Sequence, residues 1–217
     1  MLKKIADNSN PESYSNKLRK RRFNIFLNQL NSIYKNNISI LDVGGTYEFW
    51  KLLKFPLDGR YSLSILNKRI KKKHTDLIQY IESDATAMDE ITNNSFDIVF
   101  SNSVIEHVGN FEKQKSMAKE IRRISSRYFI QTPNKYFPIE PHFLFPFFQF
   151  LPRFIKAFLI RHFNLGWYNK VNNVKKSYEV ADEIRLLSKK ELTKLFPEAT
   201  IYNEKVFGLI KSFIIYN

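Results

Sequence analysis

The sequence predicts an α/β protein whose sheet is mostly parallel and ends in an antiparallel hairpin. Across residues 38–134, short aliphatic segments alternate with helical patterns in the order βαβαβαβαβ, and such alternation builds a parallel sheet with right-handed crossovers. The last two strands, 199–207 and 209–216, meet near Gly208. This connection is too tight for a crossover helix, so the two strands are antiparallel. The 217 residues suit a single domain over 1–217 and are too few for two.

The individual elements follow from local patterns. Apolar residues at helical spacing predict amphipathic helices, aliphatic and β-branched runs predict strands, and Ser188 with Glu191 has the form of a capping box. In order, we expect a poorly ordered lead-in at 1–16, a helix at 18–34, strands at 38–43, 61–67 and 77–85, a short helix near Thr86, strands at 96–100 and 127–131 around a helix at 113–124, an insert at 135–185 and a helix from 188 to 196.

The insert at 135–185 breaks the alternation of strands and helices and is rich in aromatic residues. Residues 153–163 form a predicted helix with its aromatic side chains on one half, and 164–182 are predicted to be an irregular loop. Charges and prolines interrupt 143–163 too often for a bilayer span. Its cationic amphipathic character fits a helix lying in an anionic membrane surface. The alternative is a lid that folds its apolar face onto the core of the domain.

Composition limits the chemistry. No cysteine is present, which excludes disulfides and thiolate catalysis, and four scattered histidines offer no metal-ligand spacing, so no metal is expected. The net charge of +14 favours anionic partners, although solvated lysine-rich faces explain it as well. The polar N-terminus lacks the apolar segment of a secretory signal. We therefore expect a cytoplasmic protein, and leave open its peripheral attachment to the inner face of the membrane.

Residues 38–46 carry the main functional signal. An aliphatic strand ends at Asp42 and runs through Gly44 and Gly45 into a helix start. Glycine lets the backbone pass close to a ligand, and a helix N-terminus offers free N–H groups. The G-x-G-x-x-G pattern of dinucleotide folds is absent, and Asp42 would repel a pyrophosphate. Asp42 suits a ligand with a positive charge beside a carboxylate, such as the amino-acid end of S-adenosylmethionine.

Two stretches resemble the class I S-adenosylmethionine-dependent methyltransferases. The run Leu41-Asp42-Val43-Gly44-Gly45 resembles motif I of that family, and residues 95–108 resemble its F-D-h-V-h-[SC]-x-x-V-h-E-H-h stretch. The resemblance covers about 38–134 and the C-terminal hairpin. It implies a Rossmann-like methyltransferase fold with a seven-stranded sheet, the cofactor S-adenosylmethionine, and a small single-domain enzyme that modifies metabolites, quinones, or lipid- or sugar-linked intermediates.

The resemblance also implies roles for single residues. The acid and the glycine turn would hold the amino-acid end of the cofactor, Asn67 would meet the ribose, and Asp84 would accept a hydrogen bond from the adenine while the backbone of the next residue reads the ring. The polar corner after the fourth strand would line the cleft. The expected cofactor-binding residues are Asp42, Gly44, Gly45, Thr46, Asn67, Asp84, Ala85, Ser101 and Asn102.

Three residues are candidates for catalysis. Methyl transfer from a sulfonium is an in-line displacement in a dry cleft, and a general base is needed only if the acceptor must lose a proton. The candidates are Glu106, His107 and His142, the last in a proline-stiffened segment where acceptor-site residues enter this fold. The alternative roles are structural, since Glu106 could stabilise its own helix N-terminus and His107 could pack under the insert.

We predict methyl transfer from S-adenosylmethionine to a small, hydrophobic or lipid-linked acceptor, with transfer to oxygen favoured over carbon or nitrogen. One alternative is an RNA methyltransferase, suggested by the net charge of +14. Nucleic acid is nevertheless a disfavoured partner, because Thr132-Pro133-Asn134 is not the [DNS]-P-P-[YFW] signature of amino-group methylation. The other alternative, suggested by Asn67 and the missing glycines of motif I, is a cofactor-binding or membrane-docking protein without activity.

Overall fold

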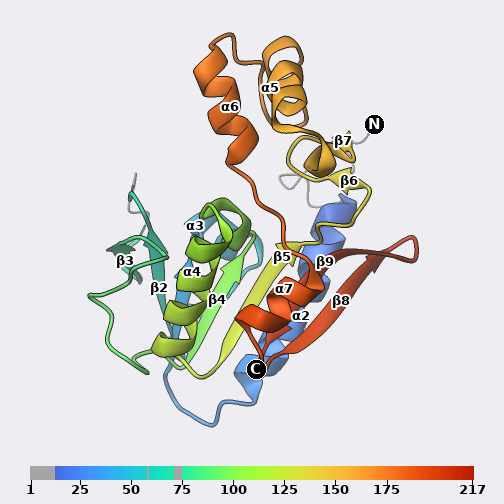
Figure 1. Ribbon diagram of the computed structural model, residues 1–217. Helices are drawn as coiled ribbons and strands as arrows, with labels where there is room; N and C mark the ends of the chain where they lie inside the picture. Colours follow the sequence, from blue (N-terminus) through green and yellow to red (C-terminus); the bar gives the residue numbers. More distant parts are fainter. Residues whose placement is uncertain (1–12, 58, 71–74) are drawn as a thin grey trace.

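The computed structural model describes residues 13–217 apart from 58 and 71–74. Its centre is a seven-stranded sheet with the order β3-β2-β1-β4-β5-β9-β8 (Figure 1). Neighbouring strands from β3 to β5 are parallel, and β9 runs antiparallel to both β5 and β8. The predicted fold class, a mostly parallel sheet with a C-terminal antiparallel hairpin, is confirmed.

The helices and strands lie close to their predicted positions. The strands of the main sheet are β1 (Ile38–Val43), β2 (Tyr61–Asn67), β3 (Ile78–Glu82), β4 (Ile98–Asn102), β5 (Tyr128–Pro133), β8 (Thr200–Val206) and β9 (Leu209–Tyr216). The helices are α2 (Tyr14–Asn31), α3 (Tyr47–Leu52), η1 (Ile105–His107), α4 (Phe111–Ile124), η2 (Phe148–Phe150), α5 (Arg153–His162), α6 (Val174–Asp182) and α7 (Lys189–Leu195). The predicted capping box at Ser188 and Glu191 is present.

Part of the predicted lead-in is helical. Residues 1–12 of the expected 1–16 segment lie outside the described residues. Ser13 is the N-cap of α2, because its hydroxyl accepts a hydrogen bond from the backbone N–H of Asn16 at 3.1 Å. A serine at this position satisfies a backbone donor that the first turn leaves unpaired, so the helix begins earlier than the apolar spacing indicates.

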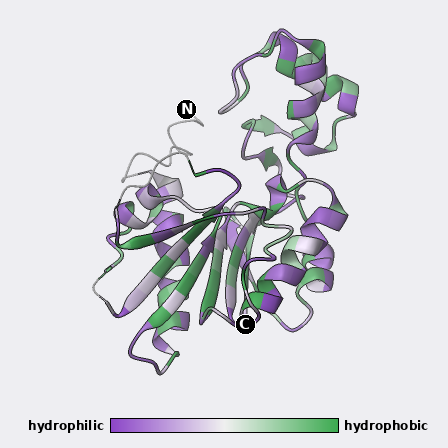
Figure 2. Ribbon diagram, turned by 90° about the vertical axis from the view of Figure 1, so that its left-hand side faces the viewer, coloured by the Kyte–Doolittle hydropathy of each residue, from purple (hydrophilic) through white to green (hydrophobic). Residues whose placement is uncertain are grey.

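Each face of the sheet has its own hydrophobic core, and the alternation of side chains along the strands divides residues between them. In β1, Ile38 and Ile40 pack with residues of α2 and α3, whereas Leu41 and Val43 pack with residues of α4 and α7. Figure 2 shows the mostly hydrophobic central strands between the helices. Two-sided burial of this kind is typical of parallel strands, and it leaves the carboxyl ends of β1 and β4 side by side.

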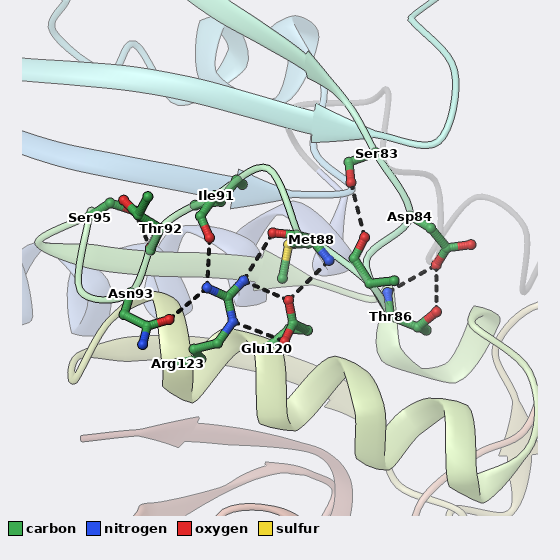
Figure 3. A network of polar contacts seen from close by, with 11 residues as sticks. Ser83, Asp84, Thr86, Met88, Ile91, Thr92, Asn93, Ser95, Glu120 and Arg123 are labelled. Carbon is green, nitrogen blue, oxygen red and sulfur yellow. Dashed lines mark hydrogen bonds and ion pairs between the residues drawn. The ribbon is translucent and has the colours of Figure 1, made fainter.

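The predicted βαβαβαβαβ order is wrong at two connections. The described residues between β2 and β3 contain no helix, and residues 83–97, all described, contain none either. Polar contacts hold the latter connection against α4 (Figure 3). The Arg123 guanidinium donates to the carbonyls of Met88 and Ile91, and Glu120 accepts from the Met88 N–H. The expected short helix near Thr86 is a turn closed by Asp84, whose carboxylate accepts the Thr86 N–H at 2.9 Å.

The insert forms a small unit beside the sheet. It contains the hairpin of β6 (Ile139–Glu140) and β7 (Phe145–Pro146), then η2, α5 and α6, and Figure 1 shows α5 and α6 standing beyond the sheet. The prediction of an irregular loop over 164–182 is wrong, because residues 174–182 form α6. Asn173 caps α6 by accepting the Lys176 N–H. The buried face of α6 packs on α5 rather than on the sheet.

The aromatic half of α5 is not folded onto the sheet core as the lid interpretation expects. The buried residues of α5 are Ala157 and Ile160, which lie on the half that also carries the charges. Phe154 and Phe158 remain 63% and 55% exposed. Among the described residues, every helix is too short or too polar to cross a bilayer.

Candidate active site

A cleft opens at the carboxyl edge of the sheet, where β1 and β4 end. Its volume is about 490 Å³. Its walls come from the end of β1, the turn that follows, α3, the end of β4 and one arginine of α2. The lining residues are Arg19, Asp42, Gly44, Gly45, Thr46, Glu48, Phe49, Leu52, Phe100 and Asn102. Open α/β sheets bind ligands at this edge, so the position agrees with the prediction.

Asp42 places a buried carboxyl group at this cleft. It is 1% exposed, and its Oδ2 accepts a hydrogen bond from the indole N–H of Trp50 at 2.6 Å. Its Oδ1 has no hydrogen-bond partner among the described residues. Burial raises the pKa of Asp42 to about 7, against the opposing effect of the Trp50 hydrogen bond. A buried carboxyl oxygen without a partner is costly, which makes Asp42 a receptor for a positively charged donor.

The two glycines are needed for different reasons. Gly44 has φ +79°, which favours glycine, and its N–H donates to the Leu66 carbonyl at 2.7 Å. At Gly45 the reason is space, since a Cβ atom would lie 1.6 Å from Asp42 Oδ2. The backbone therefore passes directly over the carboxyl group, and a side chain at Gly45 would displace it.

The remaining predicted cofactor residues are divided between this cleft and its surroundings. Thr46 lines the cleft and caps α3 by accepting the Phe49 N–H. Asn67 lies behind the turn, where its amide donates to the Gly45 carbonyl at 2.8 Å. Ser101 is fully buried and donates to the Val43 carbonyl. Asp42, Gly44, Gly45, Thr46 and Asn102 line the cleft, whereas Asn67, Asp84, Ala85 and Ser101 are not among its lining residues.

Asp84 lies at the end of β3, outside the cleft wall. Its carboxylate accepts the Thr86 N–H and hydroxyl and pairs with Lys68 at 3.0 Å. These hydrogen bonds lower the pKa of Asp84 to about 2. The role of Asp84 and Ala85 at an adenine ring therefore stays a prediction.

Two arginines of α2 belong to the site, although the sequence analysis named neither of them as a site residue. Arg19 lines the cleft. Arg22 forms an ion pair with the buried Glu204 at 3.3 Å and donates to Asn102 Oδ1. The signal that could have found them is their spacing, because both lie within one or two helical turns of the fully buried Phe26. Arg22 thereby fixes the side chain of Asn102 at the cleft.

The three predicted catalytic residues meet beside the cleft. One ligand-type atom from each of Glu106, His107 and His142 lies within 4.8 Å of the others, and the two imidazole rings meet edge to face at 4.8 Å between centroids. Glu106 is fully buried and accepts the Thr132 hydroxyl at 3.0 Å on Oε2, while its Oε1 has no hydrogen-bond partner among the described residues. The expectation that the histidines are scattered is therefore wrong for His107 and His142.

Neighbouring groups give these side chains different protonation behaviour. Burial raises the pKa of Glu106. Burial and the charge of His142 lower the pKa of His107 to about 4. For His142, burial favours the neutral ring, but the Glu140 hydrogen bond at 2.6 Å and the surrounding carboxylates outweigh it and raise the pKa. Glu140 is itself held by the backbone N–H groups of His142 and Phe143.

A single corner of the chain connects this group of residues to the cleft. Asn102 lines the cleft, and η1 begins at Ile105. Between them, Ser103 has φ +56° and hydrogen-bonds the backbone and side chain of Gln131 on β5. The strained corner turns the chain from the cleft to the three candidate catalytic residues. His162 is exposed on α5, where its ring lies against that of Phe158 at a tilt of 46°.

Known proteins resemble this chain in sequence over one segment and in structure over most of its length. A family model described as a methyltransferase domain matches residues 59–127. No protein of curated function gives a significant match to the sequence. Among solved structures, the CurJ carbon methyltransferase has a TM-score of 0.60 at 10% identity, over 94% of this chain and 55% of that one. This chain therefore spans about half the length of that structure.

Two further structures extend the similarity. The 1,6-didemethyltoxoflavin-N1-methyltransferase of Burkholderia thailandensis, solved with 1,6-didemethyltoxoflavin and S-adenosylhomocysteine, has a TM-score of 0.56 at 11% identity, covering 92% of this chain and 76% of that one. The fold is that of the class I S-adenosylmethionine-dependent methyltransferases. The PH0226 protein of Pyrococcus horikoshii OT3 shares it over 95% of this chain and 93% of its own, at 15% identity and a TM-score of 0.53.

The residues of this methyltransferase fold fit S-adenosylmethionine at its amino-acid end. The unpartnered oxygen of Asp42 can accept from an ammonium group, and the absence of a side chain at Gly45 brings the backbone close to that oxygen. Asn102 and Arg19 supply further polar groups to the cleft lining. The chemistry of these donors and acceptors matches a zwitterionic amino acid with both charges.

Proposed function

We propose that this protein transfers a methyl group from S-adenosylmethionine to a small, hydrophobic or lipid-linked acceptor. The observation that carries the proposal is the buried Asp42 carboxyl, which keeps one oxygen unpaired over the glycine turn at the carboxyl edge of the sheet. Because a buried unpartnered carboxyl costs stability, that oxygen favours a ligand that pairs with it when bound. The match to a methyltransferase domain over residues 59–127 supports the same activity.

The main contribution of the protein to this reaction is to hold the reacting groups in the right positions. Bound S-adenosylmethionine supplies an electrophilic methyl group on sulfur. Asp42 binds the ammonium, the backbone at Gly44 and Gly45 fixes the depth of the cofactor, and Asn102 is held in place by Arg22. Aligning acceptor, methyl and sulfur in a site with little water accounts for much of such a rate enhancement.

Glu106, His107 and His142 are placed to receive the acceptor. They follow the ends of β4 and β5, one corner away from the cleft, and the insert begins at the same edge. His107 and the unpaired oxygen of Glu106 offer acceptors for the proton of a hydroxyl group. This arrangement favours transfer to oxygen. A small acceptor is in keeping with the structural neighbour that binds 1,6-didemethyltoxoflavin.

The exposed aromatic residues of the insert support a hydrophobic or lipid-linked acceptor. They lie near one another in sequence, each is about half exposed or more, and basic residues of α5 accompany them. The exposed members are Phe147, Phe150, Phe154, Phe158, Phe163 and Trp167. Aromatic side chains with nearby cations suit the interface of an anionic bilayer. The insert would then bring the site to a membrane in which the acceptor is dissolved.

Calorimetry with S-adenosylmethionine and S-adenosylhomocysteine tests the activity class. We expect saturable binding of both at one site per chain, lost in Asp42→Ala and retained in His162→Ala, a change on an exposed helix position. No heat of binding at millimolar cofactor would refute the proposal.

Liposome flotation tests the membrane part separately. Vesicles with anionic headgroups should carry the wild type, and the triple change Phe147→Ser, Phe154→Ser and Phe158→Ser should reduce the floated fraction severalfold. Phe207→Ser, an exposed phenylalanine in the β8–β9 turn, is the matched control and should float as the wild type does. Equal flotation of the triple variant would exclude the insert as the contact.

A further inference from the structure

We propose that Glu106, His107 and His142 form a binding site for one divalent transition-metal cation. The metal site itself does not depend on the proposed function. Its role does, because the cation would hold the acceptor oxygen next to the cofactor cleft. The three side chains offer one carboxylate and two imidazole ligands whose atoms lie within 4.8 Å of one another. Modest side-chain rotations would bring them to metal-ligand distances of about 2.0–2.2 Å.

The type of ligand limits the type of cation. Two imidazoles and one carboxylate occupy three positions and leave others open for water or substrate, a set that suits zinc, iron, cobalt or manganese in the divalent state. Calcium and magnesium prefer oxygen ligands in larger number. The chain has no cysteine, so no thiolate competes at this place.

The side chain of Glu106 gives an independent indication of a missing partner. It is fully buried, and only one of its oxygens, Oε2, has a hydrogen bond, from Thr132. The other, Oε1, has no hydrogen-bond partner among the described residues, although buried carboxyl oxygens are normally satisfied. A cation held by Glu106, His107 and His142 would fill that vacancy, and the Thr132 bond would orient the carboxylate for it.

The surroundings of His142 match those of a metal-bound histidine. Its Nδ1 lies 2.6 Å from Glu140 Oε1, and the other Glu140 oxygen is fixed by two backbone N–H groups. Histidines that bind metals usually donate their second ring nitrogen to a carboxylate or carbonyl, which sets the tautomer and the ring direction. Here Glu140 leaves the Nε2 atom of His142 free to coordinate.

The negative charge of carboxylates near the site also favours binding of a cation. Glu106, Glu140 and Glu183 all act electrostatically on His142. Arg185 donates its backbone N–H to the Glu106 carbonyl, but its guanidinium binds Gln114 and Glu191 instead. Lys156 interacts electrostatically with Glu140, but three carboxylates against one lysine still favour a divalent ion.

A cation at this position would assist transfer to oxygen. Binding of the acceptor hydroxyl to the cation would lower the pKa of the hydroxyl. Because Glu106 and His107 then hold the cation, the hydroxyl proton would pass to water instead of to either side chain, and the alkoxide would attack the methyl group. The carbon–oxygen bond forms, the carbon–sulfur bond breaks, and the electron pair leaves with sulfur. The cation keeps its oxidation state throughout.

Cobalt(II) titration tests the site directly. Protein without a polyhistidine tag is treated with a chelator, desalted and titrated with CoCl₂, with visible absorption and calorimetry as readouts. We expect one equivalent to bind with ligand-field bands of mixed imidazole and carboxylate coordination. Glu106→Gln, His107→Gln and His142→Gln should each weaken binding by roughly tenfold or more. His162→Gln, a histidine remote from the cluster, should leave it unchanged.

Melting curves and cofactor calorimetry on the same samples separate the possible failures. If any of the three variants melts as the wild type does but keeps full cobalt affinity, or if the wild type binds no stoichiometric cobalt, the metal site is refuted. Saturable S-adenosylmethionine binding in that case leaves the proposed methyltransferase function intact. Cluster-dependent cobalt binding without cofactor binding would instead refute that function and retain the metal site.

Discussion

Asp42, within β1, and Glu106, which follows the neighbouring strand β4, are two buried carboxyl groups that differ in what surrounds them. Each has one hydrogen-bonded oxygen, to Trp50 in the first case and to Thr132 in the second, and each has one oxygen without a partner. Asp42 faces a cleft under a glycine backbone, whereas Glu106 faces two imidazole rings.

The difference between these environments indicates different ligands. A carboxyl oxygen that faces the cleft beside a glycine backbone can accept hydrogen bonds from a charged donor such as an ammonium group. An oxygen beside two ring nitrogens suits a bare cation, since the nitrogens supply further ligands. Under the two proposals, a buried carboxyl with one unpaired oxygen would hold the cofactor at Asp42 and a cation at Glu106.

The largest expected effect comes from placing a side chain over Asp42. In Gly45→Ala the new Cβ would meet the Asp42 carboxyl at 1.6 Å, so the carboxyl must move and lose its Trp50 bond. Calorimetry should find no measurable S-adenosylmethionine binding, while cobalt binding at Glu106 persists. Gly208→Ala is the control, because its Cβ meets nothing within 4 Å. It should cost roughly 1–2 kcal/mol of stability for its positive φ and leave cofactor affinity unchanged.

Next in size is the effect of Asp42 on stability as pH changes. The pKa of Asp42 is about 7 in the folded protein, compared with 3.8 for an aspartate free in water. The folded state therefore binds the proton more tightly than the unfolded chain does. The stability from this group is complete below pH 3.8 and is lost as pH rises to about 7. Between pH 5 and pH 8 the unfolding free energy of the wild type should fall by roughly 2–3 kcal/mol relative to Asp42→Asn. Parallel urea curves would contradict this.

Neutralising each carboxyl should separate the two ends of the site. Asp42→Asn removes a charge-assisted hydrogen bond to the cofactor ammonium and should weaken S-adenosylmethionine binding by about 1.5–3 kcal/mol, roughly 10- to 150-fold. Glu106→Gln should change the same affinity by less than about twofold, because sites without shared partners act independently. If both changes weakened cofactor binding alike, the division into two ends would be wrong.

The smallest predicted effect is the pH dependence of cofactor binding. Binding to the Asp42 carboxylate requires loss of its proton, so affinity should rise with pH through about 7. The expected gain from pH 6 to pH 8 is about tenfold. In Asp42→Asn the same titration should be nearly flat, and a pH profile that matched the wild type would assign the dependence to another group.

Sequence patterns predicted five of the residues that line the cleft, and they gave Glu106, His107 and His142 only as separate candidates. Asp42 lies at the end of one strand, and Gly44 and Gly45 form the turn that follows it. Their relative positions therefore depend on a short stretch of sequence and can be predicted from it. Glu106 and His142 meet only because β4 pairs with β5 and places Ser101 opposite Ile130. Proximity across a sheet carries no periodic signal along the chain. The histidines therefore looked scattered.

The chain by itself determined the positions of the strands of the main sheet along the sequence, the glycine turn, the capping box and the closing hairpin, because these depend on side chains a few residues apart. Only the tertiary structure decided the helix-free connections around β3, the existence of α6 and the exposure of Phe154 and Phe158. Each of these features depends on which other part of the chain packs against a given side of a helix or strand. Ala157 and Ile160 on the charged half of α5 are buried because that half packs on α6, and an amphipathic pattern does not show which half of a helix will be covered.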